Sequence, residues 1–457
     1  MSLQPTLTPY LRSLNVAKKN VRTFAAAAAG KTKEAAAGGS ADSYLKPRED
    51  VKTSKANNVT VSSIETNKPI SKLAVFFRAG SRFETDDTQG ATQMIRIAAG
   101  LGTSGASQLG ITRNVEQAGG NLYCTSGREY ISYTVESTRD KIGNVDRFLQ
   151  DVAVYQAFKP WELKDNVPRL RLERANRPPE VRVLELIHKS AYRKGLGYSL
   201  YSPKWMIGNH SSEMLQNFVN SNFGQACVVG IGLPHEKVVE FASRLNIKGE
   251  VGKPLPGQFN PGSEIRKETN DSLAYVALAI EGSGIANQKG QVASALAQRV
   301  LGAGTRTKRG LNAGGKLISG VVGGNDSEVA ATAFSVSYAD SGLLGVVVAS
   351  TPALIDQSTR KAADALLRTS ATEEEVTRAK NQLKTDLAIA TETDSGSLEE
   401  LGLQTLLTGK VASLSELNSL VDSVTAGDVN GILQKGKLSI ASYGNIANVP
   451  FIDQLKN

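Results

Sequence analysis

The sequence predicts an α+β protein composed of two homologous halves, each a mainly antiparallel sheet packed with helices. Short apolar runs of strand length, such as Tyr130–Val135 and Gly345–Ala349, alternate with helical segments of ten or more residues, a succession typical of helices packed on a sheet. Thr372 and Thr425 each stand three residues before an acidic residue, a pattern that caps helix N-termini. The 457 residues exceed the size at which a single core stops growing, about 250–300 residues.

The same order of elements occurs twice along the chain. An apolar strand segment opens each half, at Lys72–Gly80 and at Leu273–Gly282, and the glycines that close these segments are 202 positions apart. A helical segment follows each strand, at Ala91–Leu101 and at Gln291–Leu301. Repetition of several elements at one offset indicates an internal duplication.

The offset between the halves grows along the chain. Gly120 and Gly324 are 204 positions apart, whereas Leu170 and Leu383, in the next pair of matched helices, are 213 positions apart. We therefore expect the second half to contain a longer hairpin in the region 325–350.

A segment rich in glycine and proline separates the two halves. Residues 249–262 contain four glycines and three prolines with almost no apolar periodicity, which is typical of a linker. The sequence therefore predicts an N-terminal domain over 44–248 and a C-terminal domain over 263–457.

The first residues, 1–24, are predicted to form a mitochondrial presequence, followed by a flexible leader over 25–43 that is rich in alanine and glycine. No acidic residue precedes Glu34. An apolar helical stripe is interspersed with basic residues, namely Leu7, Leu11, Leu14 and Val21 with Arg12, Lys18, Lys19 and Arg22. Such a segment is typical of matrix targeting, and the pattern at its end indicates cleavage before Ala25.

Composition excludes several classes of protein. No stretch reaches the ~18 to 20 apolar residues that a membrane-spanning helix needs. Cys124 and Cys227 are too few for a disulfide framework, so a reducing compartment is expected. Basic residues are interspersed with acidic ones, so no nucleic-acid partner is expected. Three histidines, His188, His210 and His235, leave little material for a catalytic metal site.

One partial motif concerns phosphate binding. Gly310–Lys316 fits the spacing GxxxxGK, but Leu317 stands where a magnesium-binding hydroxyl is needed, and a helix rather than a strand precedes the loop. The glycine-rich stretch 302–324 is therefore interpreted as a mobile loop with a contact role.

A second partial motif concerns zinc. His210–Glu213 begins like HxxEH, but Met214 occupies the second histidine position. Ser211 is expected to cap the following helix, which leaves His210 outside it. His188 is interpreted as a packing or surface residue and His235 as a turn residue.

The stretch Arg78–Glu84, followed six positions later by Gly90–Ile97, resembles the start of the mitochondrial processing peptidase and pitrilysin family, M16. In that family a strand ends in GSRxE and the next helix carries the zinc motif HxxEH. On this alignment Gln93 stands at the first zinc ligand, Arg96 at the catalytic glutamate and Ile97 at the second histidine. The resemblance implies the processing-peptidase (LuxS-like metallohydrolase) fold with all three motif positions lost.

No catalytic residue, metal ligand or cofactor-binding residue is expected on this alignment. A carboxamide, a guanidinium and an alkyl group cannot replace two neutral imidazoles and a general base, and the charge of Arg96 would repel zinc. Glu173, 77 positions after Arg96, lies about where the family places its distal zinc-binding glutamate. Without the other ligands it is interpreted as a surface carboxylate that does not bind zinc.

Within the family, the chain is most similar to a non-catalytic core subunit of the mitochondrial cytochrome bc1 complex. The supporting stretches are spread over residues 44 to 457 and include Val115–Gly120, Tyr133–Glu136, Val300–Gly304, Ser337–Leu343 and Ser442–Asn445. The resemblance implies an inactive scaffold that supports assembly and dimer stability of complex III, peripheral to the inner membrane on its matrix side. The implied partners are core protein 1, cytochrome b, cytochrome c1 and the Rieske protein.

Two alternatives remain open. The first is the non-catalytic alpha subunit of the processing peptidase, which handles presequences with a glycine-rich loop. The basic residues Arg306, Lys308 and Arg309 in 302–324 suit basic presequences poorly, because acidic walls would attract them better. The second is residual processing together with core protein 1, if that partner supplies the zinc.

Overall fold

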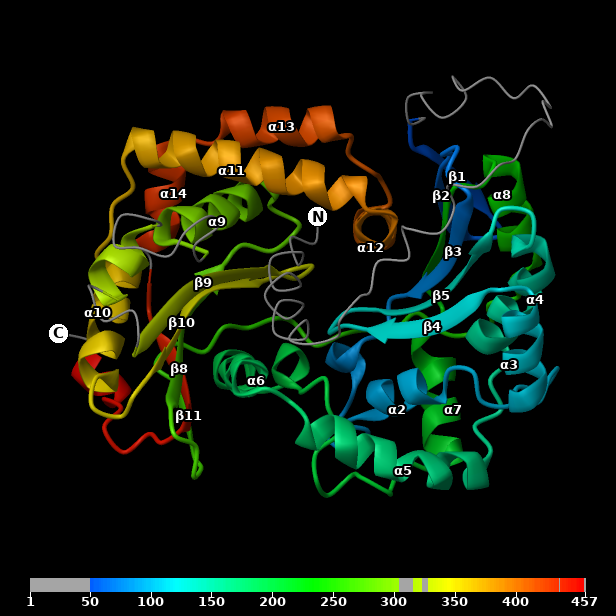
Figure 1. Ribbon diagram of the computed structural model, residues 1–457, viewed down its shortest axis with the longest axis horizontal. Helices are drawn as coiled ribbons and strands as arrows, with labels where there is room; N and C mark the ends of the chain where they lie inside the picture. Colours follow the sequence, from blue (N-terminus) through cyan, green and yellow to red (C-terminus); the bar gives the residue numbers. More distant parts are fainter. Residues whose placement is uncertain (1–49, 304–314, 323–327, 435, 456–457) are drawn as a thin grey trace, which may run out of the picture.

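The computed structural model describes residues 50–303, 315–322, 328–434 and 436–455. Within these residues two sheets lie side by side, each covered by helices (Figure 1). The predicted presequence and leader, 1–24 and 25–43, lie outside the described residues. No helix of the described ranges has the length and apolar character needed to cross a membrane.

The N-terminal sheet has six strands in the order β1-β2-β6-β3-β5-β4. Neighbouring strands are antiparallel except β2 and β6, which are parallel. The strands are β1 (Lys52–Ala56), β2 (Val59–Ile64), β3 (Ile70–Phe77), β4 (Asn121–Ser126), β5 (Ile131–Thr138) and β6 (Ala226–Ile231).

The C-terminal sheet has five strands in the order β7-β11-β8-β10-β9. Its one parallel pair is β7 with β11, and the other pairs are antiparallel. The strands are β7 (Glu264–Glu268), β8 (Ala274–Gly282), β9 (Val329–Ser337), β10 (Gly342–Ser350) and β11 (Ser439–Gly444). This order and these directions repeat those of β2-β6-β3-β5-β4, so the predicted fold of two similar, mainly antiparallel halves is confirmed.

The predicted lengthening of one hairpin is also confirmed. Strands β9 and β10 have nine residues each, whereas their counterparts β4 and β5 have six and eight. All nine residue pairs of β9 and β10 are in register. The extra residues therefore extend the hairpin without interrupting its pairing.

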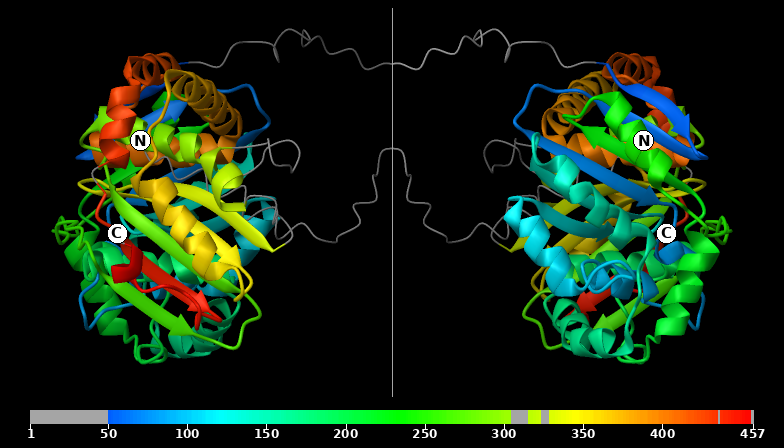
Figure 2. Two further views of the ribbon diagram at one scale, coloured as in Figure 1. Left: turned by 90° about the vertical axis from the view of Figure 1, so that its left-hand side faces the viewer. Right: turned by 90° about the vertical axis from the view of Figure 1, so that its right-hand side faces the viewer.

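Apart from α6 and α12, the helices of each half lie on one side of its own sheet, as the two side views show (Figure 2). The N-terminal half contains α2 (Ala91–Ala98), α3 (Gln108–Gln117), α4 (Ile142–Val154), α5 (Pro160–Ala175), α6 (Pro179–Tyr192), α7 (Ser212–Asn222) and α8 (His235–Arg244). The C-terminal half contains α9 (Gln288–Leu301), α10 (Ile355–Leu367), α11 (Glu373–Glu392), α12 (Asp394–Thr408), α13 (Leu414–Ser423) and α14 (Ala426–Leu433). The predicted capping boxes at Thr372 and Thr425 are both formed.

The two halves exchange one helix each. Apolar residues of α6, such as Ile187, pack against the C-terminal sheet at Tyr275 and Phe334. In return, apolar residues of α12, such as Leu401, pack against the N-terminal sheet at Phe76. Each sheet is therefore covered on its second face by a helix from the other half.

The predicted linker 249–262 contacts both halves. Its Glu250 N–H donates to Asn220 O at 2.6 Å, and its Gly257 N–H donates to Asp340 Oδ2 at 2.8 Å. The segment contains no helix and no strand of either sheet. The boundaries of the two domains stay predictions.

Candidate functional site

The helix that carries the motif positions, α2, is held at its start by a buried carboxylate. Glu84 accepts hydrogen bonds from Gly90 N at 2.8 Å, Thr92 N at 2.9 Å and Thr92 Oγ1 at 2.5 Å. Burial raises the pKa of Glu84 to about 7, although these three bonds act in the opposite direction. Gly80, four residues earlier, is needed because a Cβ would lie 2.2 Å from the backbone of Arg128.

Gln93 and Ile97 fill positions inside the fold. The Gln93 side chain is fully buried; its Oε1 accepts from Ser202 N at 2.7 Å and its Nε2 donates to Glu173 Oε2 at 2.9 Å. Ile97 lies in the apolar core of the N-terminal half. Neither side chain carries a metal-ligating imidazole, and that of Ile97 has no polar atom.

Arg96 forms an ion pair with Glu173 across the space between α2 and α5. Its Nη2 lies 2.5 Å from Glu173 Oε2, and Arg169 Nε lies 3.3 Å from the other carboxylate oxygen. Burial opposes ionisation of Glu173, but the hydrogen bonds from Gln93 and Arg96 and the charge of Arg96 outweigh it, so the pKa of Glu173 is lowered.

The four residues of the aligned site are therefore close together, as the resemblance implies, and Glu173, interpreted as a surface carboxylate, is only partly exposed. Its side chain is 24% exposed and ties α5 to α2. The sequence interval to Arg96 predicted its proximity, but the cationic neighbours that occupy its oxygens became visible only in the structure. Ser202 was not predicted at all, since no motif marks a backbone N–H that bonds to Gln93.

Among the described residues, no group of three or more His, Cys, Asp or Glu side chains is arranged to hold a metal ion. His188 lies instead at the junction of the halves, where its Nδ1 is 2.7 Å from Leu184 O and its Nε2 is 2.8 Å from Tyr338 Oη. Burial and the nearby charge of Arg128 lower the pKa of His188 to about 3. His188 is therefore a buried residue that packs between the two halves.

The other two histidines also have structural partners. His210 precedes α7, and Ser211 caps that helix by accepting from Met214 N, as predicted. The interpretation of His235 as a turn residue is wrong: it is the first residue of α8, and its ring nitrogens lie 2.9 Å and 2.7 Å from two serine hydroxyls, those of Ser54 and Ser63.

The glycine-rich stretch is only partly described, since 304–314 and 323–327 lie outside the described residues. Lys316, the lysine of the partial phosphate motif, donates to Ser370 O at 2.5 Å and pairs with Glu375 at 3.0 Å. Its ammonium group is therefore already engaged by the start of α11.

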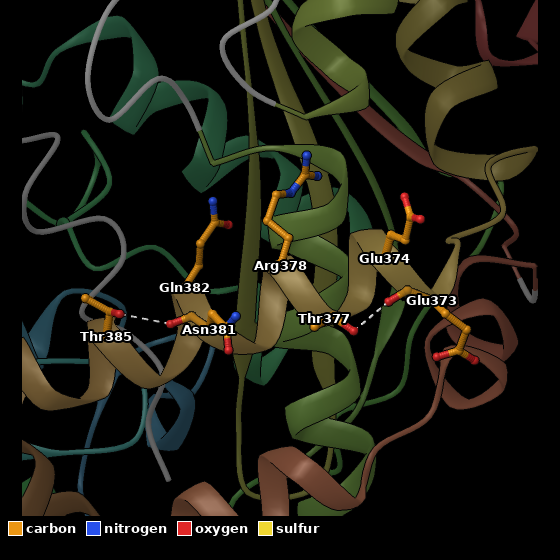
Figure 3. A pocket seen from close by; sticks show the side chains of 7 residues that line it. All are labelled: Glu373, Glu374, Thr377, Arg378, Asn381, Gln382 and Thr385. Atoms are coloured by element: carbon orange, nitrogen blue, oxygen red, sulfur yellow. Dashed lines mark hydrogen bonds between the residues drawn. The ribbon is translucent and has the colours of Figure 1, made fainter.

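A hollow of about 680 Å³ lies along α11 and is lined by seven polar residues of that one helix. Figure 3 shows Glu374, Arg378 and Gln382 projecting from the helix in the same direction. No base, nucleophile and orienting group converge there, so it does not match a catalytic arrangement.

Comparison with known protein families identifies two matching domains in this chain. Residues 59–204 match the domain described as insulinase (peptidase family M16), and residues 209–383 match the peptidase M16 inactive domain. The chain belongs to peptidase family M16. The resemblance proposed from the sequence is confirmed.

The relatives include subunits of a respiratory complex. The chain is 34% identical to the mitochondrial cytochrome b-c1 complex subunit 2 of Rattus norvegicus over 95% of its own length and 98% of the relative. It is 34% identical to the subunit 2 of Homo sapiens over 88% of its length and 91% of the relative. The predicted similarity to a core subunit of the cytochrome bc1 complex is thus confirmed.

More distant relatives include processing peptidases. The alpha subunit of the mitochondrial-processing peptidase of Solanum tuberosum is 25% identical over 91% of this chain and 86% of the relative. Among solved structures, a chain of complex III2 from Candida albicans with Inz-5 bound superposes with a TM-score of 0.77 at 21% identity, over 89% of this chain and 99% of that chain. The latter similarity supports the fold.

Proposed function

We propose that this chain is a proteolytically inactive core subunit of a mitochondrial cytochrome bc1 complex. It would support assembly and dimer stability of the complex without binding a cofactor. The observation that carries the loss of activity is the contact of Arg96 with Glu173 at 2.5 Å, at the place where the family alignment puts the metal.

The physical reason lies in charge and ligand type. Zinc in a catalytic site needs neutral imidazoles or carboxylates and an open position for water. Here the guanidinium of Arg96 supplies a fixed positive charge beside Glu173, while Gln93 donates to the same carboxylate oxygen. A divalent cation would have to displace Arg96 and would then be repelled by it.

The assembly part of the proposal is supported by the relatives. The subunits of rat and human at 34% identity are named as members of the cytochrome b-c1 complex, and coverage of 95% and 88% leaves no large part of this chain unaccounted for. We infer a position peripheral to the inner membrane on its matrix side. Core protein 1, cytochrome b, cytochrome c1 and the Rieske protein are the expected partners.

Affinity purification of the tagged full chain from detergent-solubilised mitochondria tests this assembly. The expected result is co-elution of a related core subunit and of haem-bearing subunits, seen by mass spectrometry and by haem absorbance. Elution with a zinc-bearing beta subunit and no haem would contradict the proposal and favour the processing peptidase.

The second candidate is the alpha subunit of the processing peptidase, favoured by the 25% identity to the potato protein. It predicts that the chain, mixed with a catalytic beta subunit, enables cleavage of presequences. A third candidate, residual processing with core protein 1, predicts chelator-sensitive cleavage only in the assembled complex, where core protein 1 would supply an intact HxxEH.

A further inference from the structure

A group of basic residues lies at the end of α5, in the connection to α6, on α6 and on β7, the edge strand of the C-terminal sheet. This basic cluster consists of Arg174 at the end of α5, Arg177 in the connection to α6, Arg182 in α6 and Lys267 in β7. Lys267 is exposed and the three arginines are half-buried. The cluster therefore joins the two halves of the chain at the surface.

The arginines of the cluster are held in place by the fold. Arg182 donates to Arg177 O at 2.9 Å, to Ala175 O at 2.8 Å and to Tyr443 Oη at 2.8 Å. The Ala175 carbonyl belongs to the last residue of α5 and the Arg177 carbonyl follows that helix, so both lie at its negative end. Arg177 stacks over the Tyr201 ring with 4.6 Å between the guanidinium carbon and the ring centroid.

Donors of the cluster remain available after these contacts. Arg174 uses Nη1 for Ser202 O at 3.2 Å, and Arg177 uses Nε for Arg174 O at 3.1 Å. Lys267 Nζ lies 5.8 Å from the centroid of the Tyr443 ring. Within the described ranges none of the four cluster residues pairs with a carboxylate within 4.0 Å.

The cations act on one another. The pKa of Lys267 is lowered by partial burial first and then by Arg174, Arg177 and Arg182. The pKa of Arg177 is lowered by burial, and the opposing effect of Glu185 does not compensate. Glu185 itself is engaged by Arg128 at 2.6 Å. The cluster is thus a positive surface whose cations the nearby Glu185 does not pair with directly.

We propose that the basic cluster binds an acidic polypeptide segment of a neighbouring subunit, an inference that rests on the proposed function. Charge complementarity identifies the partner, because carboxylates favour desolvated arginine forks. The four cations come from α5, its connection to α6, α6 itself and β7, so a segment that carries several carboxylates can pair with more than one of them. Binding there would also hold the two halves together.

Carbodiimide cross-linking of the purified, assembled complex tests the proposal, because this reagent joins an amine to a carboxylate only when the two are in contact. The expected product links Lys267 to an Asp or Glu of another polypeptide, identified by mass spectrometry. Lys237 and Lys410, exposed lysines elsewhere, serve as internal controls and should give at least ten-fold less product. Equal yields at the three lysines would overturn the proposal.

A variant that removes two of the positive charges provides a second test. Arg174→Gln/Arg177→Gln should reduce the Lys267 cross-link at least ten-fold, whereas the matched control Arg113→Gln/Lys237→Gln should leave it unchanged. An unchanged cross-link in the first variant would contradict the inference. Thermal unfolding of both variants checks that each is folded.

Failure of the proposed function can be distinguished from failure of this inference. If the chain does not purify with haem-bearing subunits, the proposed function fails, and binding of a synthetic glutamate-rich peptide to the isolated chain then tests the cluster alone. Loss of peptide affinity in Arg174→Gln/Arg177→Gln but not in the control would still support it. Binding of pyrophosphate, but not of the peptide, at the cluster would overturn it in favour of a small phosphate site.

Discussion

The pair Arg96 and Glu173 explains how a carboxylate remains ionised in a partly buried position without a metal. Each side chain is about one quarter exposed, 23% and 24%. Removing either partner leaves the other charge poorly solvated, which costs more than the pair contributes when both are present. Substitutions of the two residues are therefore expected to have non-additive effects on the free energy of unfolding.

A double-mutant cycle of Arg96→Met and Glu173→Gln measures this coupling by urea denaturation. Each single substitution should cost about 1–3 kcal/mol, and the double variant should lose about 1 kcal/mol less than the sum. Because the pKa of Glu173 is lowered, its contribution is present at neutral pH and lost as the pH falls through the folded-state pKa.

The matched control is Arg169→Gln, because Arg169 touches the same carboxylate but is 55% exposed. It should change the free energy of unfolding by less than about 0.5 kcal/mol. Strict additivity of Arg96→Met and Glu173→Gln would show that the two side chains do not stabilise each other.

Glu84 predicts a pH dependence of opposite sign. Its pKa in the folded chain is raised to about 7 from an ordinary 4.5, so the folded state holds its proton more tightly. The stabilisation is complete below pH 4.5 and lost as the pH rises through 7, at most about 3 kcal/mol from a shift of this size.

Urea midpoints of the unfolding transition at pH 5, 6, 7 and 8 check this dependence. The wild type should lose stability across this range, and Glu84→Gln should show a flatter profile whatever its absolute stability. Glu116→Gln, at an exposed position, should follow the wild type. Parallel profiles for wild type and Glu84→Gln would refute the assignment to Glu84.

At this scale the sequence predicted which positions meet but not how they bond. The places of Gln93, Arg96 and Ile97 were predicted from their distance in sequence to a recognisable strand end. The place of Glu173 was predicted from the number of residues that separate it from Arg96. Their partners could not be predicted, since Ser202 offers only its backbone N–H and Arg169 is one of many basic residues on α5. Side-chain geometry depends on tertiary packing that no local pattern encodes.

At the scale of elements, the exchange of α6 and α12 makes each half depend on the other. The close approach of α12 to the N-terminal sheet is made at Gly402, where a Cβ would lie 2.3 Å from the ring of Phe76. Glycine allows the helix to lie against this ring, although glycine is otherwise unfavourable in a helix.

Gly402→Ala should therefore destabilise the chain by about 1–3 kcal/mol through overpacking. The matched control is Gly431→Ala in α14, where a Cβ meets nothing within 4 Å; it should stabilise by up to about 1 kcal/mol, the helix propensity gained. Thermal unfolding distinguishes the two. Phe76→Leu should partly rescue Gly402→Ala, and equal effects of the two alanines would contradict the close contact.

The element order was predictable because strands and helices leave periodic apolar patterns that recur at a nearly constant offset. Even the longer hairpin was predicted, because the offset between the two halves grows between the matched glycines and the next pair of matched helices. The exchange was not predictable, because the apolar pattern of a helix does not say which sheet the helix covers.

For the molecule as a whole, a buried polar contact joins the halves. Arg82 is 1% exposed in its side chain and bonds Glu129 at 2.6 Å and Asp340 at 2.5 Å. It also donates to Leu255 O of the linker at 2.8 Å. Glu129 accepts further from Ala339 N at 2.9 Å. One guanidinium thus connects the N-terminal half, the linker and the C-terminal half.

Arg82→Met should destabilise the chain by about 3–5 kcal/mol, because Glu129 is left buried and unpaired. The control is Lys68→Met, which breaks a second contact between the halves, to Asp394 at 2.7 Å. Since the Lys68 side chain is 50% exposed, this change should cost less than about 1 kcal/mol. Hydrogen exchange should show loss of protection along the junction only for Arg82→Met; similar losses in both variants would argue against the buried contact.

We propose that this chain is an inactive member of a zinc-peptidase family, with Arg96 at the aligned position of the catalytic glutamate and paired with Glu173. The most direct test is cleavage of a labelled presequence-type peptide by the purified full chain, with and without a chelator. We expect no cleavage above background in either condition. Cleavage that a chelator abolishes, and that Glu173→Gln also abolishes, would contradict the account.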